Sequence, residues 1–327
     1  MRGVNLIAEY DIIINELAGS GRGKNVWETV KPILEQRQIK FDYHVSEYAG
    51  HTTRLAAKFA ESVPERQEIT PVLLVIGGDG TLNEALNGLM QVPRTHRIPL
   101  GYIPGGSGND FARALGMATN PEIALAQVLN NMRPRDLNIG YYHETLKNEH
   151  RYFVNNVGLG FDAQIVDDTN RSKQKGRLGK WAYLSNALKA YSQQEGFPLT
   201  VHVGRKRDYY KHAFLCTTSN HPYFGGGVKI LPQADLHDDQ LELIVVEEPH
   251  WWTIMWLFFL LLMGGRHLNS RFVHHYRSNQ LHLLVNSVEV GQMDGQIIGN
   301  RNYDLYFSSK PYPFWIDTSI HNHHWSN

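Results

Sequence analysis

The sequence predicts an α/β domain with a parallel sheet, followed by a mostly β domain. Extended and helical segments alternate through residues 1–134, an order typical of a parallel sheet with helices on both faces. Beyond residue 135, strand-like runs follow one another and are separated by turn residues. The 327 residues also exceed the roughly 100–200 residues of a typical domain. We therefore predict domains at 1–134 and 135–327, and allow the last residues to pack back on the first domain.

The individual elements follow from the spacing of apolar residues. The run Val72–Ile76 (VLLVI) is continuously apolar, as in a strand that is buried on both faces. In the first domain we expect strands at 10–14, 41–45, 72–76 and 98–103 and helices at 25–36, 51–62, 82–90 and 110–115. In the second we expect strands at 152–157, 199–203, 212–217, 241–246, 281–285 and 303–307 and helices at 180–191 and 251–263.

Composition narrows the class of protein. Lys plus Arg equals Asp plus Glu, at 32 each, so the basic excess of a nucleic-acid-binding protein is missing and no nucleic-acid partner is expected. The single cysteine, Cys216, rules out a disulfide within the chain and fits a reducing compartment. Glu9 and Asp11 interrupt the apolar residues near the start, so no signal peptide is predicted and a cytoplasmic location is expected.

One apolar segment needs separate treatment. Residues 251–263 (WWTIMWLFFLLLM) contain no charge, but a helix of this length spans about 20 Å, against about 30 Å of bilayer hydrocarbon. It is too short to cross. Because it is apolar on every face, it is either a core helix, which short apolar runs usually are, or a helix that dips into lipid.

Two glycine-rich loops carry the chemistry. The first is Gly77, Gly78, Asp79, Gly80 and Thr81, between a buried strand and a helix. Glycines allow the backbone to approach a ligand and present its N–H groups, and the helix adds its positive N-terminal end, which together favour phosphate. A tight turn would need only one glycine.

The second loop follows the next extended segment and contains Gly105, Gly106, Ser107, Gly108, Asn109 and Asp110. Loops at the carboxyl ends of neighbouring parallel strands converge on one crevice, so the pair predicts a polyphosphate ligand. A Walker loop is excluded because Ala18 and Asn25 stand where that motif requires glycine and Ser or Thr, and no Rossmann glycine motif is present.

These motifs make the chain similar to the diacylglycerol kinase catalytic family and its bacterial lipid-kinase relatives. The resemblance rests on GGDGT with Asn83 and Glu84, PGGSGNDFAR, NNVGLGFDA (155–163), GKWAYL (179–184), GGGVKILPQADLHDDQLEL (225–243) and MDGQ (293–296). It covers nearly the whole chain in the family's order.

The resemblance implies a kinase with an ATP-binding N-terminal domain, a C-terminal β-sandwich, and lipid entering between them. It assigns both glycine loops, with Asn15 and Gly19 of an earlier turn, to ATP and Mg²⁺, and Asp294 to the general base. It also implies a second magnesium site at Asp238 with the main-chain carbonyls of Asp235 and Gln240. From the residues alone, Asp294-Gly295 is equally a common hairpin turn, and 235–240 a polar turn.

Two further points bear on function. Six basic residues follow one another without an intervening acid: Arg171, Lys173, Lys175, Arg177, Lys180 and Lys189. Together with the apolar segment 251–263 they predict peripheral contact with anionic lipid, although a solvated face is the simpler interpretation. The chain departs from the family pattern at Glu16, Ser20, Asp239 and Gln296. These departures leave open a weakly catalytic lipid-binding regulator, and GGDGT leaves open an NAD kinase. Diacylglycerol is the favoured lipid, and a homodimer is compatible with the resemblance.

Overall fold

The computed structural model describes residues 8–65, 69–161, 163, 196–247 and 250–319. Its contacts divide the chain into two compact units. The first contains the described residues of 1–138 together with 225–227 and 311–319, and the second contains those of 139–224 and 228–310. The boundary predicted from the sequence lies at 134/135, with the chain end allowed to return to the first domain. In the structure, the chain end belongs to the first unit from Pro311 onward.

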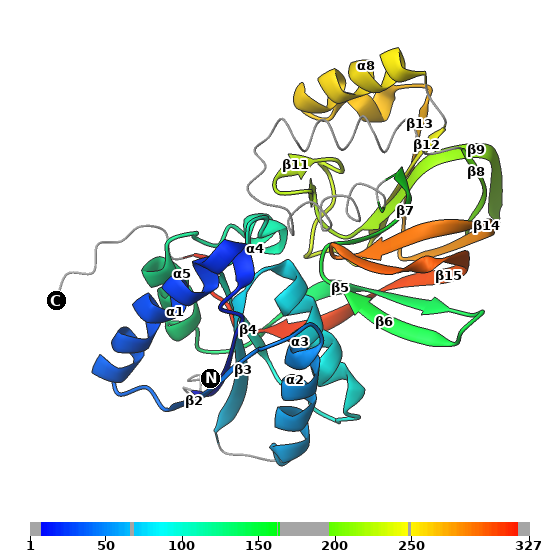
Figure 1. The fold of residues 1–327 in the computed structure, drawn as a ribbon. Helices are drawn as coiled ribbons and strands as arrows, with labels where there is room; N and C mark the ends of the chain where they lie inside the picture. Colours follow the sequence, from blue (N-terminus) through cyan, green and yellow to red (C-terminus); the bar gives the residue numbers. More distant parts are fainter. Residues whose placement is uncertain (1–7, 66–68, 162, 164–195, 248–249, 320–327) are drawn as a thin grey trace, which may run out of the picture. The chain divides into compact units, whose positions relative to one another are not determined.

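The first unit is built on a sheet with the strand order β4-β3-β1-β2, in which each neighbouring pair is in parallel register. Helices α1 and α5 cover one face of this sheet, and α2 and α3 cover the other (Figure 1). The elements are β1 (Ala8–Ile14), α1 (Ala18–Gln36), β2 (Phe41–Val45), α2 (His51–Ser62), β3 (Thr70–Gly77), α3 (Asp79–Gln91), β4 (Leu100–Pro104), α4 (Asp110–Leu115) and α5 (Pro121–Leu129).

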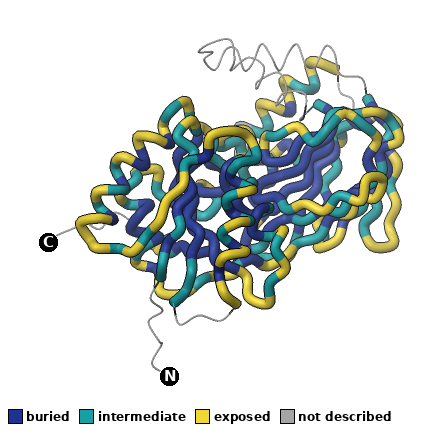
Figure 2. Tube along the Cα trace, turned by 60° about the horizontal axis from the view of Figure 1, so that its bottom comes forward, coloured by how far each residue is buried: buried dark blue, intermediate teal, exposed yellow. Residues whose placement is uncertain are grey.

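The core of this unit explains the continuous apolar runs. Ile12 and Ile14 of β1 and Leu74 of β3 are fully buried against α1 and α5, and Figure 2 shows the buried strands between more exposed helices. A strand covered by helices on both faces has no solvent side, so alternation disappears from its sequence. Trp315, from the returning chain end, completes this core and donates its indole N–H to the Tyr10 hydroxyl at 3.1 Å.

The second unit is mostly antiparallel, with the strand path β13-β12-β9-β7-β14-β15. Strand β8 pairs with the first part of β9 and the first part of β14, whereas β7 pairs with their later parts, so the two long strands pass between layers. The elements are β5 (Arg135–Glu144), β6 (Glu149–Phe153), β7 (Asn156–Gly160), β8 (Phe197–Val203), β9 (Lys206–Ser219), β10 (Tyr223–Phe224), β11 (Val228–Lys229), β12 (Leu241–Glu247), α8 (Trp251–Leu262), η1 (Arg266–Asn269), β13 (Val273–Ser278), β14 (Gln280–Met293) and β15 (Gln296–Phe314). The predicted order of an α/β domain followed by a strand-rich domain is confirmed.

Helix α8 departs from the sequence-based expectation of a core helix. Leu257 is 9% exposed and packs into a small cluster with Ile244 and Val273, but Trp252 is 68% exposed. The other large apolar side chains of this segment that are exposed are Trp251, Met255, Trp256, Phe258, Phe259 and Met263. The helix therefore buries one narrow stripe and leaves most of its apolar surface on the outside of its unit.

Two features of the sequence analysis lie outside the described residues, namely the basic cluster from Arg171 to Lys189 with its helix at 180–191, and the motif GKWAYL (179–184). Among the residues that the structure describes, no helix has the length and apolarity needed to span a membrane.

Candidate functional site

The three predicted ATP-binding segments meet in the first unit at the carboxyl ends of β1, β3 and β4. The Asn15 main-chain N–H donates to the Ile76 carbonyl at 2.9 Å, and its side-chain amide donates to the Thr81 hydroxyl at 3.1 Å. The Gly105 N–H donates to the Gly77 carbonyl at 2.6 Å. These bonds join the loop after β1 to the loop after β3, and that loop to the one after β4.

The glycines are required because the loops touch through their backbones. A Cβ atom on Gly106 would lie 2.5 Å from the Gly78 Cα atom, and one on Gly19 would lie 2.5 Å from the Gly105 carbonyl oxygen. Gly19 also has a φ of 60° and begins a left-handed turn that continues through Ser20 and Gly21. This turn is why the regular part of α1 begins only after Gly21, close to the predicted start at Asn25. Side chains at Gly19, Gly78 or Gly106 would push the loops apart.

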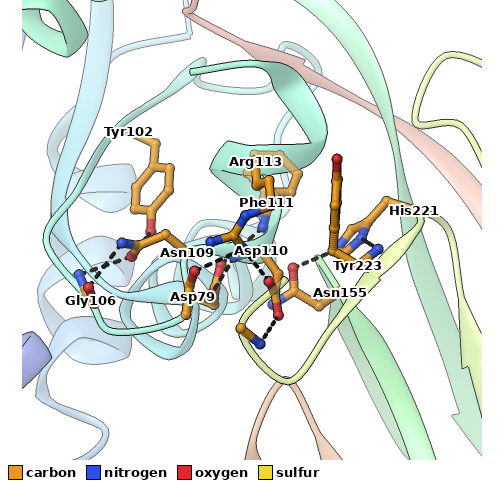
Figure 3. A network of polar contacts seen from close by, with 12 residues as sticks. Asp79, Tyr102, Gly106, Asn109, Asp110, Phe111, Arg113, Asn155, His221 and Tyr223 are labelled. Atoms are coloured by element: carbon orange, nitrogen blue, oxygen red, sulfur yellow. Dashed lines mark hydrogen bonds and ion pairs between the residues drawn. The ribbon is translucent and has the colours of Figure 1, made fainter. Parts of the chain in front are cut away.

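Asn109 holds the second glycine loop in its shape. Its Oδ1 accepts the Gly106 N–H and its Nδ2 donates to the Gly106 carbonyl, both at 2.9 Å (Figure 3). The buried Tyr102 hydroxyl lies 3.3 Å from the same Oδ1. Arg22, which the sequence analysis did not select, donates to the Gly106 carbonyl at 3.0 Å and so places a guanidinium at the edge of this loop.

Asp79 and Asp110 bring two carboxylates together. Asp79 accepts the N–H groups of Asp110 and Phe111, both at 3.1 Å, and so caps the start of α4 (Figure 3). Asp110 accepts from Arg113 at 2.6 Å and from the Gly226 N–H at 2.8 Å. Burial raises the pKa of Asp110, and the charge of Asp79 raises it further, while Gly226 and Arg113 oppose the shift.

These groups fit the nucleotide and metal that the resemblance implies. Two adjacent carboxylates offer the hard oxygen ligands that Mg²⁺ prefers. Because glycines make these contacts, no side chain covers the loop backbone there. Helix α3 begins at the first of these loops, and its positive N-terminal end suits phosphate oxygens.

Asp294 lies in the second unit, at a two-residue turn between β14 and β15. Met293 pairs with Gln296, and Asp294 and Gly295 have φ values of 49° and 82°, so the hairpin interpretation of Asp-Gly is confirmed. Asp294 is 7% exposed, and its carboxylate accepts hydrogen bonds from three main-chain N–H groups. Asn155 and Asn156 donate to Oδ1, both at 2.9 Å, and Val154 donates to Oδ2 at 2.7 Å.

These three hydrogen bonds hold the Asp294 carboxylate in one orientation. Three N–H donors stabilise the ionised form of a carboxylate over the protonated form. The donors lie about 140 positions earlier in the chain, and Asn155 and Asn156 begin the motif NNVGLGFDA, for which the sequence predicted no role.

The residues of the predicted second magnesium site, Asp235, Asp238 and Gln240, lie in a polar turn before β12. The Asp238 carboxylate forms an ion pair with Arg277 and accepts the Gln240 N–H at 2.7 Å, and the Asp235 carbonyl accepts the Asp238 N–H at 3.2 Å. A guanidinium therefore pairs with the expected carboxylate ligand, as Arg113 does with Asp110, and the second magnesium site stays a prediction. Within the described part of the chain, no cluster of three His, Cys, Asp or Glu side chains could hold a metal.

Comparisons with known proteins agree with both units. The model of the diacylglycerol kinase catalytic domain matches residues 9–140, and the model of the YegS C-terminal NAD kinase beta sandwich-like domain matches residues 155–308. The protein YtlR of Bacillus subtilis (strain 168) is 26% identical over 318 residues, which cover 95% of this chain and 100% of that protein. A protein of the same strain named diacylglycerol kinase is 28% identical over 291 residues, covering 88% of this chain and 89% of that one.

Solved structures share the fold. A structure described as a diacylglycerol kinase from Bacillus anthracis str. Sterne superposes with a TM-score of 0.67 at 18% identity, covering 96% of this chain and 98% of that one. A second structure from the same organism gives a TM-score of 0.73 at 20% identity with the same coverage.

Proposed function

Because the chain belongs to the family of bacterial diacylglycerol kinases and related lipid kinases, we propose that it transfers the γ-phosphoryl group of ATP to a lipid hydroxyl, with diacylglycerol as the favoured substrate. The observation that carries the proposal is the packing of the two glycine loops against each other through bare backbone, at the carboxyl ends of β3 and β4. Bare loop backbone beside the N-terminus of α3 suits a chain of phosphates.

The first unit would bind and orient the nucleotide. The loop residues Gly77–Thr81 and Gly105–Asn109, with Asn15 and Gly19 beside them, would surround the phosphates. Asp79 and Asp110 would hold Mg²⁺, which neutralises phosphate charge when bound. Arg22 lies beside the second loop and would add positive charge there. Positioning and charge neutralisation are the main requirements of phosphoryl transfer.

The second unit would supply the base. Asp294 is held in its turn by three N–H donors, which favour the ionised carboxylate that a general base must be. It would accept the proton of the lipid hydroxyl as that oxygen attacks the γ-phosphorus, the bond to the β–γ bridging oxygen breaks, and ADP leaves. Gln296, where the chain departs from the family pattern, begins β15 directly after this turn and offers an amide and no second carboxylate.

We further propose that the protein works at the cytoplasmic surface of a membrane and contacts it through α8. Seven large apolar side chains are exposed in or directly after this helix, and three of them are tryptophans, which favour the boundary between lipid and water. No charge interrupts the helix, and Arg266 and Arg271 follow it closely. An apolar helix with basic residues beside it suits a peripheral, reversible contact with anionic lipid.

The deciding experiment is a transfer assay with labelled ATP, magnesium and a panel of lipids in mixed micelles, with NAD as a soluble acceptor. We expect label on diacylglycerol, loss of label in Asp294→Asn, and normal label in Asp136→Asn, a matched change of an exposed carboxylate. Label on NAD alone would establish the NAD kinase alternative. No label on any acceptor, with vesicle binding intact, would establish the regulatory alternative.

A further inference from the structure

Behind the Asp294 turn lies a buried polar network that the proposed reaction does not use directly. It contains Asn155, Ser219 and His221, all within the second unit, and His221 is 0% exposed. Figure 3 shows the imidazole directed at the Asn155 side chain. Asn155 is also one of the three donors to Asp294, so the network touches the carboxylate through one main-chain bond.

The hydrogen bonds define the protonation of His221. Its Nδ1 accepts the Tyr223 main-chain N–H at 3.1 Å, so the proton of the neutral ring lies on Nε2. Nε2 then donates to the Asn155 Oδ1 at 2.7 Å. Burial lowers the pKa of His221 to about 3, so the ring stays neutral and this bond persists across the physiological range.

The main chain of Asn155 is held from a second side. The Ser219 hydroxyl lies 2.7 Å from the Asn155 carbonyl oxygen and accepts the His221 N–H at 3.3 Å. Asn155 is therefore fixed through its side-chain oxygen and its carbonyl oxygen at once. With both ends fixed, its own N–H and that of Asn156 keep their direction toward the Asp294 carboxylate.

We propose that His221 is a positioning residue for lipid phosphorylation, which holds Asn155 so that the N–H cradle fixes the direction and charge of the Asp294 carboxylate. The inference rests on the proposed function. Placing an imidazole in a fully buried position has a desolvation cost that an apolar side chain would avoid. The hydrogen bond to Asn155 is what the imidazole provides and an apolar side chain cannot.

The test compares His221→Leu, which fills the space without a donor, with His221→Gln, whose amide can restore the donor. We expect His221→Leu to lower kcat about 10-fold or more, though less than the 10²–10⁴-fold loss from removing a base, with KM for ATP and lipid unchanged. The acid limb of its pH–kcat profile should move to higher pH, because a weaker cradle favours the ionised carboxylate less. His221→Gln should recover most of kcat, and His212→Gln, at an exposed position of β9, should match the wild type.

A second readout does not depend on activity. Hydrogen exchange of the Asn155 and Asn156 amides, measured by NMR, should accelerate in His221→Leu and return toward the wild-type rate in His221→Gln. If His221→Leu does not fold, Ser219→Ala, which removes only one hydroxyl, should show the same two effects in smaller measure. Unchanged kcat and exchange in the folded variants would overturn the inference. A wild type without kinase activity but with the expected exchange would overturn the proposed function and leave the cradle intact.

Discussion

Replacing Asp294 by asparagine should remove activity and also destabilise the second unit, and the size of the second effect follows from the hydrogen bonds. Oδ1 of Asp294 accepts two main-chain N–H groups and Oδ2 accepts one. An asparagine has a single acceptor oxygen. Its best orientation keeps Asn155 and Asn156 paired and turns the amide NH₂ toward the Val154 N–H. One buried donor is then unpaired and faces another donor.

Leaving a buried donor unpaired costs about 1–3 kcal/mol. Since about 1 kcal/mol shifts Tm by about 2–4 °C in a unit of 150–250 residues, we expect a decrease of roughly 2–12 °C. Asp294→Ala leaves all three donors unpaired and should be less stable still. Loss of the base should lower kcat by about 10²–10⁴-fold while ATP binding remains.

The assay combines calorimetry, ATP binding by titration and transfer of labelled phosphate to lipid, with Asp136→Asn as the matched control. Normal turnover by Asp294→Asn would show that the base lies elsewhere. An unchanged Tm would show that the cradle around the carboxylate does not form in solution. Loss of ATP binding in this variant would contradict the assignment of the nucleotide to the first unit.

Three other predictions concern separate parts of the molecule. Asp79→Ala should abolish magnesium-dependent ATP binding and, because Asp79 caps α4 through the Phe111 N–H, lower the free energy of unfolding by about 0.5–2 kcal/mol. Titration with ATP measures the first effect and urea unfolding the second. Normal ATP affinity would refute the assignment of Asp79 to the nucleotide site. Trp252→Ser, at an exposed position of α8, should weaken sedimentation with phosphatidylglycerol vesicles without loss of stability. Leu257→Ser, at a buried position of the same helix, should lower the free energy of unfolding by about 2–5 kcal/mol. If Trp252→Ser changes the oligomeric state and leaves vesicle binding unchanged, a second copy of the chain covers α8. His221 is neutral in the folded state but has a pKa near 6.5 when unfolded, so between pH 3 and 6.5 the folded state binds fewer protons and the free energy of unfolding should fall, as pH decreases, by up to about 1.4 kcal/mol per pH unit. The urea midpoints of the wild type and His221→Gln should therefore converge below pH 6.5. Parallel curves of midpoint against pH would contradict the buried neutral ring.

Much of the fold could be predicted because its causes are local. The continuous apolar run of β3 and the glycines after it reflect burial on both faces and close backbone contact, and both leave marks in adjacent residues. The hairpin at Asp294 is likewise encoded by one dipeptide. The meeting of the glycine loops in the first unit was predictable for a similar reason, because parallel strands place their carboxyl ends together.

The sequence by itself determined the order of the elements, the glycine loops and the residues that resemble a kinase, because periodicity and turn chemistry act over a few neighbours. The tertiary structure alone decided which side of α8 is covered, that Arg277 neutralises Asp238 across 39 positions, and that Asp294 receives its donors from Val154, Asn155 and Asn156. Pairings of this kind depend on which distant segments the sheet brings together. Burial and hydrogen bonding are properties of that assembled neighbourhood, and no residue carries them alone.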